Sequence, residues 1–136
     1  MADTYTILGT RPDVEFLGGT LTRNVMVVSV LTREHSIYFE TRIPSKDYTA
    51  AVAKENAFGF TIVYELLFDI PGVAAVTWSQ QTTDTGQLQD HVLIYVESTS
   101  GNSSGIVNVP YSQFAQELVK PKVAKLRTAL DDAENA

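Results

Sequence analysis

The chain carries one pattern twice, and this internal repeat limits the folds open to it more than any other feature. Residues 25–44 run from an apolar strand through a polar turn to a second strand and a proline, and residues 91–110 do the same. Matching positions lie 66 residues apart: Val28 and Ile94, Val30 and Val96, Ile43 and Val109, Pro44 and Pro110, Tyr48 and Phe114, Val52 and Leu118. This spacing predicts a tandem of two strand–strand–helix units.

The strands of the first copy differ in their periodicity. Residues 24–31 are apolar on both strand faces, which indicates a central strand covered on both sides or a strand in a subunit contact. Residues 37–43 alternate, so that Ile37, Phe39, Thr41 and Ile43 share one face. Residues 4–9 predict a short preceding strand that Gly9 and Pro12 end.

A helix is predicted from about Lys46 to Phe68, capped by Ser45, with Ile62, Val63 and Leu66 in its core stripe. Its second half is more apolar than one stripe requires, and its own sheet covers only one side. The other side therefore needs a second helix or another subunit. We expect subunit contacts through the side chains outside the core stripe, which are Phe60, Tyr64, Leu67 and Phe68. Trp78 is a further candidate, and the plainer alternative for it is packing on a sheet face.

The remaining elements complete a β-β-β-α-β-β-β-α order. Strands are predicted at 73–82, 88–98 and 106–109, with Asp84-Thr85-Gly86 turning the first hairpin. The second helix should begin near Ser112 and kink or break near Val119–Lys120, just before Pro121. We expect one domain over residues 1–136, with ββα units at 24–70 and 73–133. Its α+β fold should be one mostly antiparallel sheet with both helices packed on one face.

Composition excludes several classes of function. The net charge of −6 over 136 residues opposes a sequence-independent grip on nucleic acid. The absence of cysteine excludes disulfides, thiolate metal sites and a cysteine nucleophile. The N-terminal residues do not resemble a signal peptide, and no apolar run approaches the roughly 20 residues of a membrane helix. We therefore expect no direct nucleic-acid partner and no membrane partner.

The sequence offers no motif for catalysis or for a cofactor. His35 lies in a predicted turn and His91 at a strand start, and neither has the spacing of a metal-ligand pair. No G-x-S-x-G elbow accompanies the serines, and the loop 101–105 lacks the lysine of a phosphate-binding loop. We expect no enzymatic activity, no catalytic or metal-binding residue and no cofactor.

One segment resembles a known class of proteins. The hairpin from Val25 to Val52, with the run Arg42-Ile43-Pro44-Ser45-Lys46-Asp47-Tyr48-Thr49, is similar to small virion proteins of tailed bacteriophages, especially those infecting actinobacteria. In that family a strand ends in an apolar–proline pair and a tyrosine begins a helix. The second copy departs from this pattern, because Phe114 stands in the place of the tyrosine. The resemblance implies a non-enzymatic structural subunit present in many copies.

The expected function is therefore structural assembly in a phage particle, as a capsid decoration or a small tail component. The expected partners are other copies of the chain and other virion proteins, and the expected location is the virion, assembled in the host cytoplasm. The alternative is a small ligand-binding or regulatory α+β domain with its pocket between the sheet and the helices.

Overall fold

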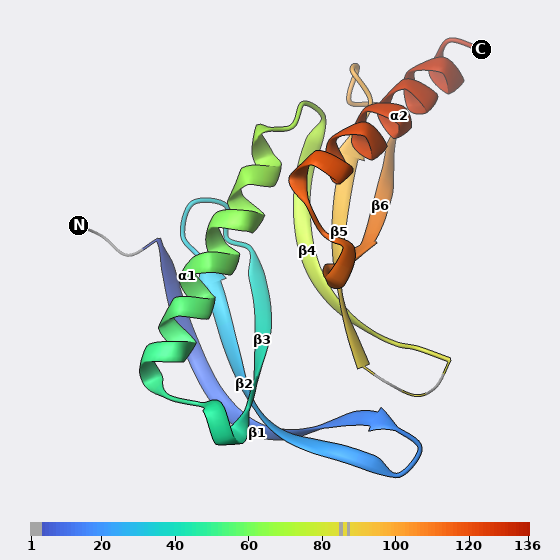
Figure 1. The fold of residues 1–136 in the computed structure, drawn as a ribbon. Helices are drawn as coiled ribbons and strands as arrows, with labels where there is room; N and C mark the ends of the chain where they lie inside the picture. Colours follow the sequence, from blue (N-terminus) through green and yellow to red (C-terminus); the bar gives the residue numbers. More distant parts are fainter. Residues whose placement is uncertain (1–3, 85, 87) are drawn as a thin grey trace.

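The computed structural model describes residues 4–84, 86 and 88–136, so Thr85 of the predicted hairpin turn lies outside the described residues. The fold is α+β, as predicted, and consists of two βββα repeats in series (Figure 1). The first repeat contains β1 (Tyr5–Gly18), β2 (Leu21–Thr32), β3 (Tyr38–Pro44), η1 (Ser45–Asp47), α1 (Ala50–Leu66) and η2 (Leu67–Asp69). The second contains β4 (Val73–Thr82), β5 (Leu88–Glu97), β6 (Ser104–Pro110), η3 (Tyr111–Gln113) and α2 (Gln116–Glu134).

The internal repeat extends to the strand pairing. Val28 pairs with Thr41 in the first repeat, and Ile94 pairs with Val107 in the second, 66 residues later. The irregularity between Ile7 and Gly9 in β1 recurs between Val73 and Ala75 in β4. The repeating unit therefore has three strands, because β1 and β4 occupy matching places although their sequences differ.

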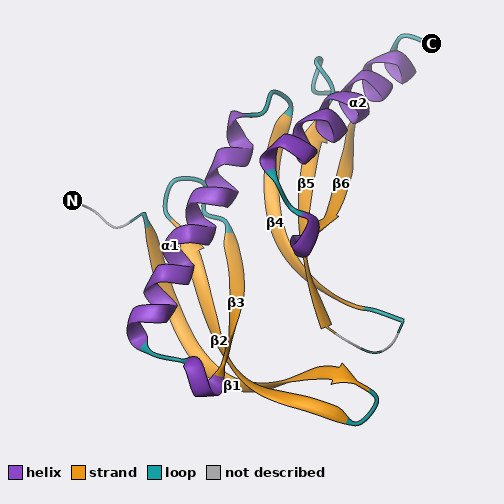
Figure 2. Cartoon of the chain, viewed as in Figure 1, coloured by secondary structure: helices purple, strands orange, loops and turns teal. Residues whose placement is uncertain are grey.

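The strands form two sheets, so the expected single sheet was too simple a description. Each sheet has three antiparallel strands, in the orders β1-β2-β3 and β4-β5-β6. Among the described residues, no ladder joins β3 to β4. Side chains connect these two strands instead: the rings of Tyr38 and Trp78 meet edge to face with their centroids 6.1 Å apart. Figure 2 shows α1 lying against the first sheet and α2 against the second.

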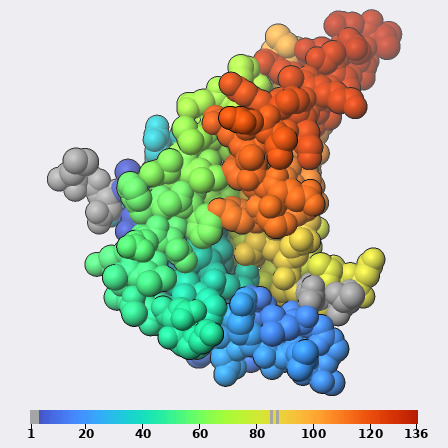
Figure 3. All heavy atoms as spheres, viewed as in Figure 1, coloured from blue at the N-terminus to red at the C-terminus, as the bar shows by residue number. Residues whose placement is uncertain are grey.

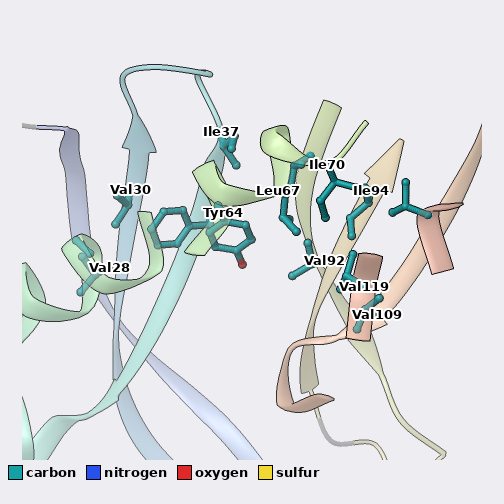
Figure 4. Packing of buried hydrophobic residues seen from close by; sticks show 14 of the residues in the cluster. Val28, Val30, Ile37, Tyr64, Leu67, Ile70, Val92, Ile94, Val109 and Val119 are labelled. Carbon is teal, nitrogen blue, oxygen red and sulfur yellow. The ribbon is translucent and has the colours of Figure 1, made fainter. Parts of the chain in front are cut away.

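One apolar core runs through both repeats. Figure 4 follows it from Val28 in the first sheet, past Tyr64 and Leu67, to Val92 and Val119 in the second repeat. These five side chains are all at most 2% exposed. Because the two sheets share this core, we expect the two repeats to depend on each other for stability.

The central strand β2 is buried on both faces within a single chain. Val28 faces the core, and Val27 on the opposite face is also fully buried. In the strand register Val27 lies between Arg11 of β1 and Arg42 of β3. The aliphatic stems of arginines can cover apolar surface while their charged ends reach polar groups. The first alternative for this segment, a central strand covered on both sides, is confirmed.

The bounds of β1 and α1 differ from the predictions for local reasons. β1 continues through Pro12 to Gly18, because it is an edge strand, where a missing backbone N–H is tolerated. The residues after Pro44 form the 3₁₀ turn η1, and α1 begins only at Ala50. Thr49 caps α1 instead of Ser45, since its Oγ1 accepts the backbone N–H of Val52 at 3.1 Å.

Of the kink or break predicted near Val119–Lys120, the break is wrong. α2 begins at Gln116 and continues through Pro121 to Glu134. The proline lies in the second turn of this helix, so it removes one backbone hydrogen bond near the start while the long remainder stays intact. Val119 and Val123, one turn apart around the proline, are fully buried and hold the helix on its sheet across this point.

The packing of α1 also differs from the prediction. Its buried face is built from Ala53, Ala57, Thr61 and Tyr64, whereas Ile62 and Leu66 of the predicted core stripe are exposed. Small residues let a helix lie close to a sheet, and a pattern that weights large apolar side chains overlooks them. The helix therefore has the expected excess of apolar residues, but Tyr64 from outside the predicted core stripe is buried, and Ile62 and Leu66 from within it are exposed.

The shared core predicts a large difference between two leucines. Leu67 is fully buried and Leu118 is 59% exposed. Leu67→Ala should lower the free energy of unfolding by about 2 to 5 kcal/mol, because it leaves a cavity. Leu118→Ala should change it by roughly 0.5 kcal/mol or less. Urea unfolding followed by circular dichroism measures both, and equal effects would contradict this description of the core.

Candidate functional site

The contact between the two repeats, which we call the seam, contains most of the residues predicted to bind another subunit. Tyr64 and Leu67 are 2% and 0% exposed, so they offer a second molecule almost no surface. Phe60 is half-buried, and its ring meets Tyr111 of η3 edge to face with centroids 4.8 Å apart. Tyr111 also stacks on Phe114. The second repeat therefore supplies the cover that the apolar half of α1 requires.

The two other predicted contact residues also lie against residues of their own chain. Trp78 of β4 is half-buried, and the Arg42 guanidinium lies 5.6 Å from the centroid of its ring. Phe68 is half-buried and stacks in parallel on the His35 ring, with centroids 3.8 Å apart. Phe60, Phe68 and Trp78 thus keep some exposed surface, and their part in a subunit contact stays a prediction.

An ion pair crosses the seam beside a cleft. Arg42 of β3 donates to the Asp90 carboxylate of β5, and the Arg42 side chain is 8% exposed. The cleft has a volume of about 330 Å³ and is lined by both of these residues, by Tyr64 and Tyr111, and by Thr41. In the described part of the chain the buried Thr41 hydroxyl has no hydrogen-bond partner. The seam is therefore mainly apolar, with a small polar hollow at one edge.

Burial changes the acidity of the two seam tyrosines. It raises the pKa of the Tyr111 phenol to about 12, with a further contribution from the negative charge of Asp90. Burial also raises the pKa of Tyr64 well above its ordinary range, helped by Tyr111 and Asp90. Both effects disfavour phenolate in the folded chain, so both hydroxyls stay protonated at neutral pH.

The buried Tyr64 predicts a loss of stability in alkali. The folded pKa is raised above the ordinary value of 10.0, so above pH 10 the unfolded chain loses a proton that the folded chain keeps. Tyr64 should therefore reduce the free energy of unfolding by about 1.4 kcal/mol per pH unit above pH 10. Urea unfolding at pH 9, 10 and 11 should show a shallower decline for Tyr64→Phe. An unchanged slope would contradict the assignment.

Apart from Leu8 and Tyr38, the large exposed apolar side chains of the first repeat lie on two features outside the seam. The first is the arm, residues 12–24, where the β1–β2 hairpin extends beyond the sheet at one end of the molecule (Figures 1 and 3). Its apolar side chains are 40–67% exposed: Val14, Phe16, Leu17 and Leu21. Arg23 and Glu15, which are paired across the two strands, form an ion pair at 2.6 Å.

The second feature is the helix stripe, which consists of Phe58, Ile62 and Leu66 on α1. These residues recur every fourth position and therefore lie on one face of the helix. They are 40–51% exposed, and the face opposite them carries the buried Ala53 and Ala57. The stripe leaves a row of large apolar side chains open to solvent along the helix.

The second repeat shows that the fold does not need these apolar side chains. Positions that match Val14 and Phe16 are Gln80 and Thr82, in the corresponding hairpin. Positions that match the helix stripe are Ala124, Thr128 and Asp132 in α2. The same backbone thus carries small or polar residues in one repeat and large apolar residues in the other. The sequence signal that could have identified this surface is the difference between matching positions of the two copies, which a comparison along their full length reveals.

No protein-family profile, no curated protein and no solved structure matches this chain. Among the described residues, neither helix is both long and apolar enough to cross a membrane.

Proposed function

We propose that the protein is a structural assembly subunit that acts by binding further copies of itself through the arm and the helix stripe. The observation that carries this proposal is the contrast between the repeats. Phe16 and Ile62 are 47% and 44% exposed, whereas Thr82 and Thr128 stand at the matching positions. Exposed apolar surface that the fold does not require is typical of an interaction site.

The free edge of β1 favours a second copy as the partner. β1 has 14 residues and stands at the end of its sheet, and no other strand in the described part of the chain pairs with its outer side. An edge strand of this length readily pairs with an identical strand, and a twofold axis makes that pairing antiparallel. Val14 and Phe16 lie on this same strand, so the pairing would bring the apolar side chains of two arms together.

The setting that we propose is a tailed-phage particle, in which the chain decorates the capsid or forms a small tail component. The resemblance of residues 42–49 to phage virion proteins supports it. That motif forms a strand end, the turn η1 and the Thr49 cap of α1. A structural role in a virion assembled in the host cytoplasm requires many copies and other virion proteins as neighbours. A net charge of −6 suits contacts with protein better than contacts with nucleic acid.

Two charge substitutions test the contact surface. Phe16→Glu and Ile62→Glu should each reduce the mass seen by light scattering toward that of one chain, because a charge in an apolar contact is costly to desolvate. The matched controls are Thr82→Glu and Thr128→Glu, at the corresponding positions of the second repeat. These should leave the mass and the far-ultraviolet circular dichroism unchanged.

A wild-type chain that stays monomeric at high concentration would reject self-assembly. A thermal shift of such a monomer with one compound of a metabolite panel would support the ligand-binding alternative. The seam cleft favours that alternative, since its volume of about 330 Å³ and its unpartnered Thr41 hydroxyl fit a small polar ligand.

A further inference from the structure

The turn between β2 and β3 meets the C-terminal half of α1 at a cluster of metal-binding side chains. Glu34 and His35 lie in this turn, and Glu65 lies 30 positions further along the chain, on the helix. Their imidazole nitrogen and carboxylate oxygens all lie within 4.8 Å of one another. It is the one group of three such residues among those that the structure describes. No motif in the sequence indicates this cluster, because only the fold brings the three side chains together.

Three contacts fix the position of the imidazole. The backbone N–H of His35 donates to Oε1 of Glu65 at 3.2 Å, and Nδ1 of His35 contacts Oε2 of the same carboxylate. The ring is stacked on Phe68 with an angle of 2° between the planes. The next residue, Ser36, has a φ of 54°, in the left-handed region that non-glycine residues rarely adopt. The backbone hydrogen bond and the ring stack do not use Nδ1, so they can hold the imidazole in place when Nδ1 binds an ion.

The cluster opens to solvent through a hollow of about 580 Å³. Asp69 lines this hollow together with Glu34 and Glu65, so three carboxylates face one opening. The guanidinium that lines it belongs to Arg33, whose Nε donates to Thr6 on β1 at 3.3 Å. The carboxylates thus exceed the fixed cations around the opening, which favours the entry of a divalent cation.

We propose that Glu34, His35 and Glu65 bind one divalent transition-metal ion, with Zn²⁺ as the preferred ion. Zn²⁺ accepts both histidine nitrogen and carboxylate oxygen as ligands, whereas Mg²⁺ and Ca²⁺ prefer oxygen ligands alone. In the bound state Nδ1 of His35 and Oε2 of Glu65 ligate the same ion instead of each other. The Glu34 carboxylate, which already lies within 4.8 Å of the other two ligand atoms, is the third ligand, and water occupies the fourth position. The ion then ties the β2–β3 turn to α1.

The test is calorimetric titration of the untagged full chain with zinc chloride, together with a melting curve. The wild type should bind one equivalent of Zn²⁺ and melt at a higher temperature with it, and Mg²⁺ should give neither effect. Glu34→Gln, His35→Ala and Glu65→Gln should each weaken zinc binding at least tenfold. His91→Gln removes the other histidine and should leave the titration unchanged.

Circular dichroism of each variant shows whether it remains folded, and Glu34→Gln is the safest reporter because its side chain is exposed. Co²⁺ adds an independent readout, since tetrahedral coordination gives visible absorption that His35→Ala should abolish. If the wild type binds no zinc, His35 and Glu65 make only a structural contact and the proposal fails. Zinc binding that His91→Gln weakens as much as His35→Ala does would also overturn it. Neither result bears on self-assembly, which is measured by mass.

Discussion

The aromatic contact at the seam is the interaction on which the rest of this structure depends. α1 is too apolar for one three-stranded sheet to cover, and Tyr64 and Leu67 are buried in the core that both repeats share. Tyr111 completes the contact by meeting both Phe60 and Tyr64. The two sheets do not need backbone hydrogen bonds to each other, because the shared core holds them together. The seam thereby fixes which surfaces of each repeat stay free.

The contrast between the two repeats gives a physical account of the exposed surface. Both repeats keep the same register and the same bulge, so the backbone demands little of the arm and of the outer face of the helix. The second repeat carries Thr82 and Thr128 there, and the first carries Phe16 and Ile62. Stability of the single chain does not explain that difference. The contact with a further copy that we propose would explain it, and the free edge of β1 lies next to the arm.

The sequence predicted the strand and helix order because β2, β3, β5 and β6 bury alternate or continuous apolar residues. It missed most of β1, since an edge strand exposes polar residues and Pro12 resembled an end. It also showed that α1 needed cover on two sides, yet periodicity cannot say which chain supplies it. The small residues Ala53 and Ala57 hid the true core face. The cluster of Glu34, His35 and Glu65 could not be predicted from the sequence, because only the fold brings Glu65 to His35.

Equilibrium unfolding followed by two probes tests the interdependence of the repeats most directly. Trp78 is the single tryptophan, and it lies at the seam, so its fluorescence reports loss of the contact with Arg42 and Tyr38. Far-ultraviolet circular dichroism reports the strands and helices of both repeats. If the seam holds the fold together, the two urea transitions should coincide at one midpoint. A fluorescence change that is complete before half of the secondary structure is lost would show that the repeats stand independently.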